Sequence, residues 1–166
     1  MVIFAKVLSY WRYLGYLAIV AIALTTTTDV IGRYLFNQPL PGGMELIEQY
    51  MVCVVFLMLP LVTWDERHIK VDFIANFIAG KVPRLMLLVG LVFELIILVV
   101  LVVFAWQGFV TSALYMHIGE ETEVIGVKLY PFQLVMSVGF SLASIAFLIL
   151  FIHHLSELST KMRRHS

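Results

Sequence analysis

The sequence has few charged residues, a single cysteine and no excess of either charge sign. Only 13% of its 166 residues are charged, whereas about a quarter are charged in an ordinary soluble domain. Eleven Lys and Arg balance eleven Asp and Glu, so no basic excess favours binding to nucleic-acid phosphates. A single cysteine, Cys53, excludes a disulfide-stapled fold. The apolar content of 61% and the mean hydropathy of +0.98 exclude intrinsic disorder and indicate an integral membrane protein.

Four continuous apolar stretches are long enough to cross a bilayer as helices. A helix needs about 20 apolar residues to cross a hydrocarbon core of roughly 30 Å. The predicted spans are residues 13–31, 46–64, 85–106 and 131–152. Because these runs do not alternate between apolar and polar residues, they disfavour a β-barrel. We therefore predict an all-α integral membrane protein with four transmembrane helices in one domain, residues 1–166.

The basic residues are distributed unevenly along the chain. Nine of the eleven Lys and Arg residues lie in the N-terminal segment, in the loop between the second and third spans, or in the C-terminal tail. Only Arg33 and Lys128 lie in the other two loops. Since Lys and Arg accumulate on the cytoplasmic side, we predict that both termini are cytoplasmic and that the first and third loops lie outside.

The first outer loop combines turn-forming residues with a candidate ion pair. Asn37 and Pro39 are typical of a tight turn. Asp29 and Arg33 are four residues apart with the acid first, which is the favoured order for an ion pair on a helix. Glu45 and Glu48 follow near the start of the second span, where negative charge suits the helix dipole.

The loop between the second and third spans has an amphipathic pattern. Apolar residues including Phe73 and Phe77 fall on one helical face, which predicts an interfacial helix over residues 68–79 on the cytoplasmic surface. His68 and Asp72 are spaced as two metal ligands on a helix would be. Two ligands do not make a site, so a hydrogen bond that orders the start of this helix is the favoured interpretation.

Glu94 lies among apolar residues in the third predicted span. Carboxyl groups within a membrane often mark an ion pathway or a buried partner. One interpretation is therefore a proton or cation site. The other is a protonated, structural Glu94 that hydrogen-bonds to the next helix, where Ser137, Ser141 and Ser144 share a face. No second intramembrane carboxylate or arginine lies near Glu94, which favours the structural interpretation.

The sequence offers no recognisable set of catalytic or cofactor-binding residues. No nucleophile–base pair, phosphate-binding loop or metal motif is present, so an enzyme is not expected. His117, His153, His154 and His165 suggest haem ligation, but no two of them fall at one depth on facing helices. We therefore predict no cofactor.

Two segments resemble the small membrane subunit, of the DctQ type, of tripartite ATP-independent periplasmic (TRAP) transporters. The first is the stretch RYLFNQPL at residues 33–40, with Glu45 and Glu48 after it. It is similar to that family's Arg-Tyr-x-Phe-Asn-x-Pro turn followed by acidic residues. The second is HIKVD at residues 68–72, which is similar to the family's His-Ile-x-Val-Asp signature. Glu66 and Arg67 stand where the family usually has glycines.

This resemblance implies a bacterial inner-membrane protein with two protein partners. In that family a large multi-spanning subunit carries the substrate and sodium sites and works as an elevator. A periplasmic binding protein delivers an organic acid such as a C4-dicarboxylate or a sialic acid. The small subunit is expected to widen the scaffold and help dock the binding protein. The alternative left open by the residues is a self-contained oligomeric transporter or channel that uses Glu94.

Overall fold

The computed structural model describes the backbone of residues 2–65 and 83–164 and the side chains of residues 6–65 and 90–152. Four long helices make up nearly all of this part of the chain, in the order α1 (Val2–Phe36), α2 (Gly43–Trp64), α4 (Pro83–Ile118) and α5 (Tyr130–Arg164). Each contains a segment long and apolar enough to cross a membrane. The prediction of an all-α protein with four membrane helices is confirmed. The predicted interfacial helix, 68–79, lies outside the described residues.

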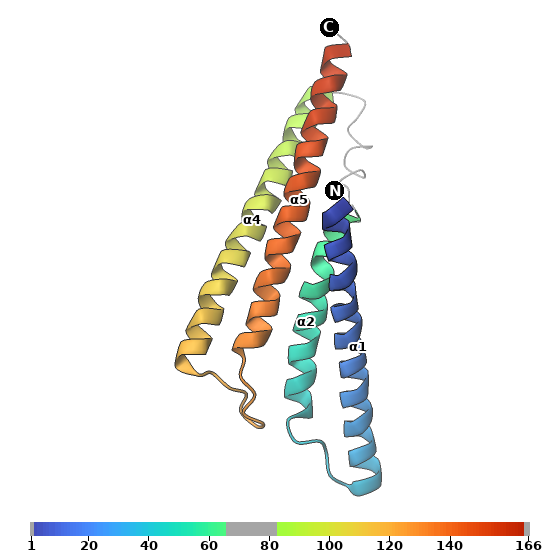
Figure 1. Cartoon of the computed structure of the whole chain (residues 1–166), viewed down its shortest axis with the longest axis vertical. Helices are drawn as coiled ribbons and strands as arrows, with labels where there is room; N and C mark the ends of the chain where they lie inside the picture. Colours follow the sequence, from blue (N-terminus) through green and yellow to red (C-terminus); the bar gives the residue numbers. More distant parts are fainter. Residues whose placement is uncertain (1, 66–82, 165–166) are drawn as a thin grey trace.

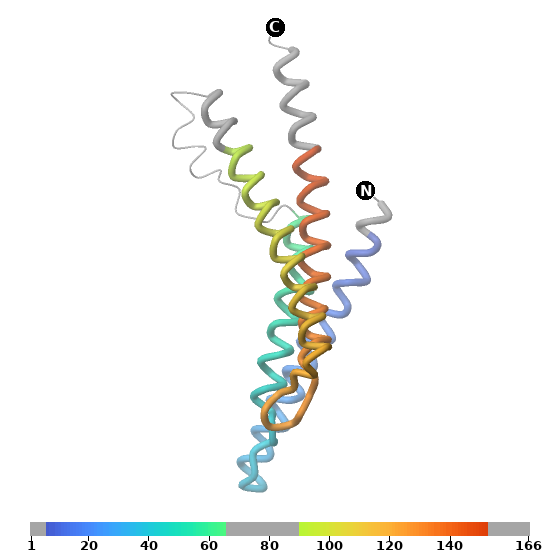
Figure 2. The backbone as a smooth tube through the Cα atoms, turned by 90° about the vertical axis from the view of Figure 1, so that its left-hand side faces the viewer, coloured from blue at the N-terminus to red at the C-terminus, as the bar shows by residue number. Residues whose placement is uncertain are grey.

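The four helices stand side by side in one open row rather than in a closed bundle. Contacts join α4 to α5, α5 to α2, and α2 to α1 (Figure 1). The helices alternate in direction, so residues 37–42 and 119–129 lie at one end of the row, which we call the loop end. Seen from the side, the helices overlap near the loop end and fan apart toward the other end (Figure 2). The order of contacts leaves α1 and α4 as the two edges of the row.

Contacts along the row follow a repeat that alternates between three and four residues. In α4, the less exposed side chains fall at this spacing: Leu91, Glu94, Leu98, Leu101, Ala105, Gly108, Ser112 and Tyr115. In α1, the same spacing runs through Leu8, Trp11, Gly15, Ala18, Ile22, Thr25, Asp29 and Gly32. Side chains spaced on average 3.5 residues apart form one stripe, which stays against the neighbouring helix when the two helices cross in a left-handed manner. Each edge helix therefore packs through a single stripe.

The two central helices, α2 and α5, approach closely because a glycine of α5 lies against the backbone of α2. A Cβ atom at Gly139 would collide with the backbone oxygen of Phe56, and Ala143 and Ala146 are fully buried. This is the close approach that small residues allow between membrane helices. Beside it, the Phe140 ring lies 4.7 Å from Phe56 and 5.4 Å from Phe104, centroid to centroid, and so joins three helices.

The third helix extends farther than the sequence predicted. We expected this span to end at Trp106 and an outer loop to begin at Gln107, but α4 continues to Ile118. Small and polar residues of the added segment lie on the stripe facing α5. Gly108 packs against Ser137, and the Ser112 hydroxyl donates to the Tyr130 carbonyl at 3.1 Å. Trp106 therefore lies inside a long helix and not at its end.

The row leaves most of its apolar surface uncovered, and the two edges are the most open. In the most apolar window of each helix, 28% of residues are buried in α2 and in α5. The corresponding shares are only 11% in α1 and 6% in α4. Lipid or another protein must therefore cover most of this surface.

Candidate functional site at the loop end

The end of α1 is fixed by a buried carboxylate. Asp29 is 8% exposed, and its Oδ2 atom accepts a hydrogen bond from Arg33 Nε at 2.8 Å. Its Oδ1 atom accepts another from the Leu40 backbone N–H at 2.9 Å. The predicted ion pair is thus present. The Asp29 carboxylate also binds the backbone that returns from α1, which the spacing of Asp29 and Arg33 did not predict.

Residues 37–42 turn back along the last turns of α1. Asn37 starts the reversal with a positive φ of 51°, which asparagine tolerates better than most residues. The Gln38 N–H then donates to the Gly32 carbonyl at 3.1 Å. A Cβ at Gly32 would lie 2.6 Å from the Gln38 oxygen, so glycine is needed for this close approach. The returning chain carries Pro39 and leads directly into α2.

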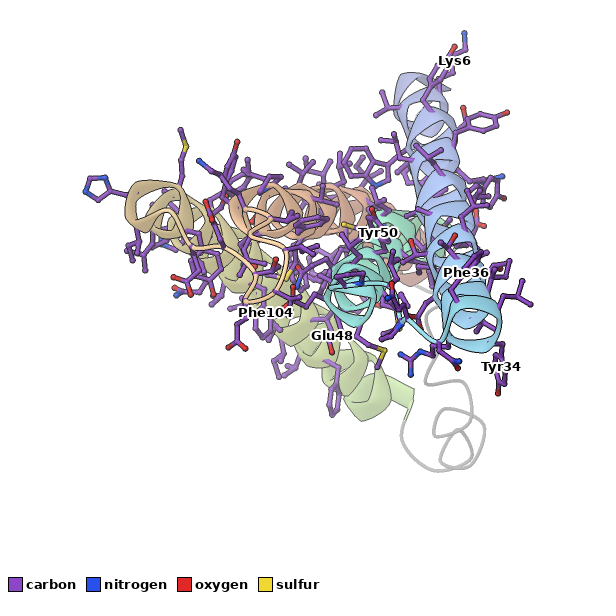
Figure 3. All side chains as sticks on the ribbon, turned by 90° about the horizontal axis from the view of Figure 1, so that it is seen from below. Lys6, Tyr34, Phe36, Glu48, Tyr50 and Phe104 are labelled. Atoms are coloured by element: carbon purple, nitrogen blue, oxygen red, sulfur yellow. The ribbon has the colours of Figure 1, made fainter. Side chains whose placement is uncertain are left out.

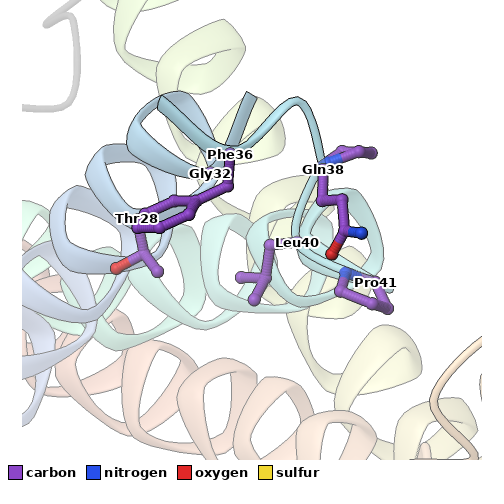
Figure 4. Close-up of a pocket in the computed structure, with 7 residues that line it drawn as sticks. Thr28, Gly32, Phe36, Gln38, Leu40 and Pro41 are labelled. Carbon is purple, nitrogen blue, oxygen red and sulfur yellow. The ribbon is translucent and has the colours of Figure 1, made fainter. Parts of the chain in front are cut away.

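Because of this turn, α1 projects beyond the start of α2 at the loop end (Figure 1). The projecting turn exposes large apolar side chains: Tyr34 is 84% exposed, Leu35 74% and Phe36 71%. Seen from the loop end, Tyr34 points away from the other helices (Figure 3). A shallow hollow of about 250 Å³ lies between this turn and the returning chain. Phe36, Thr28 and Leu40 are among its lining residues (Figure 4).

Glu45 connects the two loops at this end. Its carboxylate accepts a hydrogen bond from the Val124 backbone N–H, at 3.0 Å from Oε1 and 3.3 Å from Oε2. Next to this bond, the Ile125 side chain packs on Gly42, where a Cβ atom would collide with it. Gly42 has a φ of 69°, which favours glycine on backbone grounds as well. Glu45, together with Gly42, therefore holds the loop between α4 and α5 against the start of α2.

The loop between α4 and α5 is folded by its own hydrogen bonds. Glu121 and Lys128 form an antiparallel bridge, and the Thr122 N–H donates to the Val127 carbonyl at 2.9 Å. The Thr122 hydroxyl accepts a hydrogen bond from the Val127 N–H at 3.0 Å. Three exposed carboxylates lie on this loop, those of Glu120, Glu121 and Glu123, and a fourth, Glu48, is exposed on α2. The loop end is therefore an ordered surface with an acidic border.

The three serines of α5 are hydrogen-bonded within their own helix. Glu94 lies on the α4 stripe that faces α5. The three serine hydroxyls all donate to carbonyl groups of their own helix: Ser137 to Gln133, Ser141 to Ser137, and Ser144 to Ser141, each at 2.8 Å. Their protons are therefore not directed at Glu94. Glu94 also lies 24 residues before the end of α4 at Ile118, about 36 Å along the helix. Glu94 is therefore closer to the start of α4 at Pro83 than to the loop end.

Several predicted residues lie outside the described part of the chain. The structure gives no account of His68, Asp72, Phe73 or Phe77. Within the residues that it does describe, no three His, Cys, Asp or Glu side chains are grouped as a metal ion would require.

Sequence reasoning missed the bond between Glu45 and the loop 119–129, because 79 residues separate Glu45 from Val124. A weak signal was available in Gly42 and Gly126, since glycines in short loops often mark positive φ. Both adopt it, with φ of 69° and 62°. Neither glycine identifies a partner, so the contact itself could not be predicted.

Fold and loop end together define a multi-pass helical membrane protein. Comparison with known families identifies it further: a model described as "Tripartite ATP-independent periplasmic transporters, DctQ component" matches residues 22–157. The chain belongs to this family and is a small subunit of a TRAP transporter. It is thus a transporter component and not a member of an enzyme family. No curated protein matches the chain.

Proposed function

We propose that this chain is the scaffold subunit of a sodium-coupled, binding-protein-dependent importer of an organic acid. The cargo class is a carboxylate such as a C4-dicarboxylate or a sialic acid. The chain supports the large multi-spanning subunit, and its loop end helps dock the periplasmic binding protein. The family match supports the assignment to a tripartite transporter, and the open row supports the scaffold role.

The observation that carries the scaffold role is the open edge on both sides of the row. Only 11% and 6% of the most apolar windows of α1 and α4 are buried. A chain that carried a substrate alone would need to enclose polar groups between its helices. A chain that widens another protein's scaffold needs apolar surface instead, and this chain has it on both edges.

The charge distribution supports an inner-membrane orientation with both termini in the cytoplasm. Nine Lys and Arg residues then lie inside and two outside, as the positive-inside rule requires. In this orientation the loop end faces the periplasm. Its ordered acidic border, from Glu45 and Glu48 to Glu123, is the surface offered to a binding protein.

The cytoplasmic side carries a second proposed anchor. The amphipathic segment 68–79, with Phe73 and Phe77 on its apolar face, would seat the row at the membrane surface. His68 and Asp72 would order the start of that helix. Replacing both Phe73 and Phe77 with Glu should lower the amount of membrane-inserted chain, whereas unchanged insertion would contradict the interfacial assignment.

Co-expression with the large subunit and the binding protein tests the scaffold role. We expect sodium-dependent uptake in proteoliposomes only when all three proteins are present. The variant Glu94→Gln should retain uptake, because Glu94 lies on a helix-packing stripe. If the purified chain alone catalyses flux and Glu94→Gln abolishes it, the alternative of a self-contained transporter replaces this proposal.

A further inference from the structure

Gln107 is a polar residue on an otherwise apolar edge of the row. It lies 11 residues before the end of α4 at Ile118, about 16 Å along the helix. It therefore lies inside the apolar segment Gly90–Ile118, which is long enough to cross a membrane. Its side chain is exposed, and its amide has no hydrogen-bond partner among the described residues.

The residues around Gln107 form a second regular stripe on α4. Val100, Val103, Gln107, Val110 and Leu114 are spaced alternately three and four residues apart. This is the spacing of the stripe that packs on α5. The four apolar members are between 44% and 57% exposed. The stripe is turned away from α5, and no other described helix covers it.

The chemistry of an amide decides what can cover this stripe. A glutamine amide offers two donors and an acceptor oxygen, and lipid tails satisfy none of them. An amide left without a partner in an apolar medium costs several kcal/mol. The covering element must therefore bring a hydrogen-bonding group to the depth of Gln107, as polar side chains do between membrane helices.

We propose that this stripe on α4, centred on Gln107, docks a transmembrane helix of the large transporter subunit. That helix presents a polar side chain to the Gln107 amide. The inference rests on the proposed scaffold role and specifies the surface that carries it. It also continues the existing row, since α4 is an open edge and a further helix there would extend the sequence of contacts α1, α2, α5, α4.

The test compares Gln107→Leu with wild type in co-expression with a tagged large subunit. Leucine keeps the size and removes the amide. We expect roughly threefold to tenfold less of this chain to be recovered with the large subunit. Gln107→Asn should restore part of the loss, because it keeps the amide. Each variant expressed alone should elute in size-exclusion chromatography as wild type does, which shows that the row still folds.

Thr27→Val on α1 is the matched control. Thr27 is also polar and exposed, but its hydroxyl already donates to the Ala23 carbonyl at 2.7 Å, so recovery should not change. Wild-type recovery with Gln107→Leu would overturn the inference, and so would cross-links at residue 107 that join two copies of this chain. If the wild-type chain itself fails to bind the large subunit, the scaffold proposal fails first and this inference with it.

Discussion

The two edge helices are both largely open and yet differ in the polar side chains that they expose. On α1, three of the four consecutive threonines, Thr25, Thr27 and Thr28, donate their hydroxyl to a carbonyl four residues earlier, at 2.7–2.8 Å. On α4, the exposed Gln107 amide has no such partner among the described residues. A threonine satisfied by its own helix can face lipid at little cost, whereas a bare amide cannot. If the large subunit docks on α4 as proposed, hydrogen bonding distinguishes the two edges better than exposure does.

The largest effect is expected from breaking the row between its two halves. Gly139→Leu should prevent α5 from packing on α2, because even a Cβ atom there meets the Phe56 backbone oxygen. With the row divided, the two edges no longer belong to one scaffold. We expect most of the chain to aggregate or elute early in size-exclusion chromatography. Gly90→Leu is the control, since a Cβ at Gly90 has no neighbour within 4 Å. A normal elution profile for Gly139→Leu would contradict the described contact.

The next effect concerns the end of the α1 edge. Asp29→Ala removes a buried acceptor that serves both Arg33 and Leu40. It should lower the free energy of unfolding by about 1.5–3 kcal/mol. Arg33→Ala should cost less than about 1 kcal/mol, because the Arg33 side chain is 52% exposed. Thermal unfolding in detergent measures both. Equal losses for the two variants would show that Asp29 serves mainly the ion pair and not the returning chain.

A smaller effect is expected where the loop next to the α4 edge meets α2. Glu45→Ala removes the acceptor of the Val124 N–H, so residues 122–126 should exchange amide hydrogens several-fold faster. Glu48→Ala is the control, because Glu48 is exposed and accepts no described hydrogen bond. Binding-protein affinity should fall with Glu45→Ala if an ordered loop is needed for docking. An unchanged rate of amide hydrogen exchange at Val124 would show that Glu45 does not connect the two loops.

The smallest effect is expected on the α1 edge itself. Thr27→Val should change the free energy of unfolding by no more than about 0.5 kcal/mol, since the hydroxyl bonds only its own helix. Thermal unfolding in detergent is the measurement. A loss of more than about 1 kcal/mol would show that the α1 edge depends on its threonine hydroxyls.

The sequence predicts the number and type of helices well, because long apolar runs have few alternatives in a membrane. It also predicts the Asp29–Arg33 pair, since four-residue spacing is local. It fails at the end of α4, where Gly108 and Ser112 resemble loop residues but face α5. It cannot predict the bond from Glu45 to Val124, which depends on how distant helices align. Because the predicted third span ended at Trp106, Gln107 was assigned to a loop and its place on α4 was missed.

Site-specific photo-cross-linking compares the two edges most directly. A photo-reactive residue is placed at Val103 on the α4 edge or at Val20 on the α1 edge, where the side chains are 57% and 53% exposed. Each chain is then irradiated in membranes with the large subunit. The account predicts strong cross-links to the large subunit from residue 103 and few from residue 20. Cross-links to the large subunit mainly from residue 20 would contradict it.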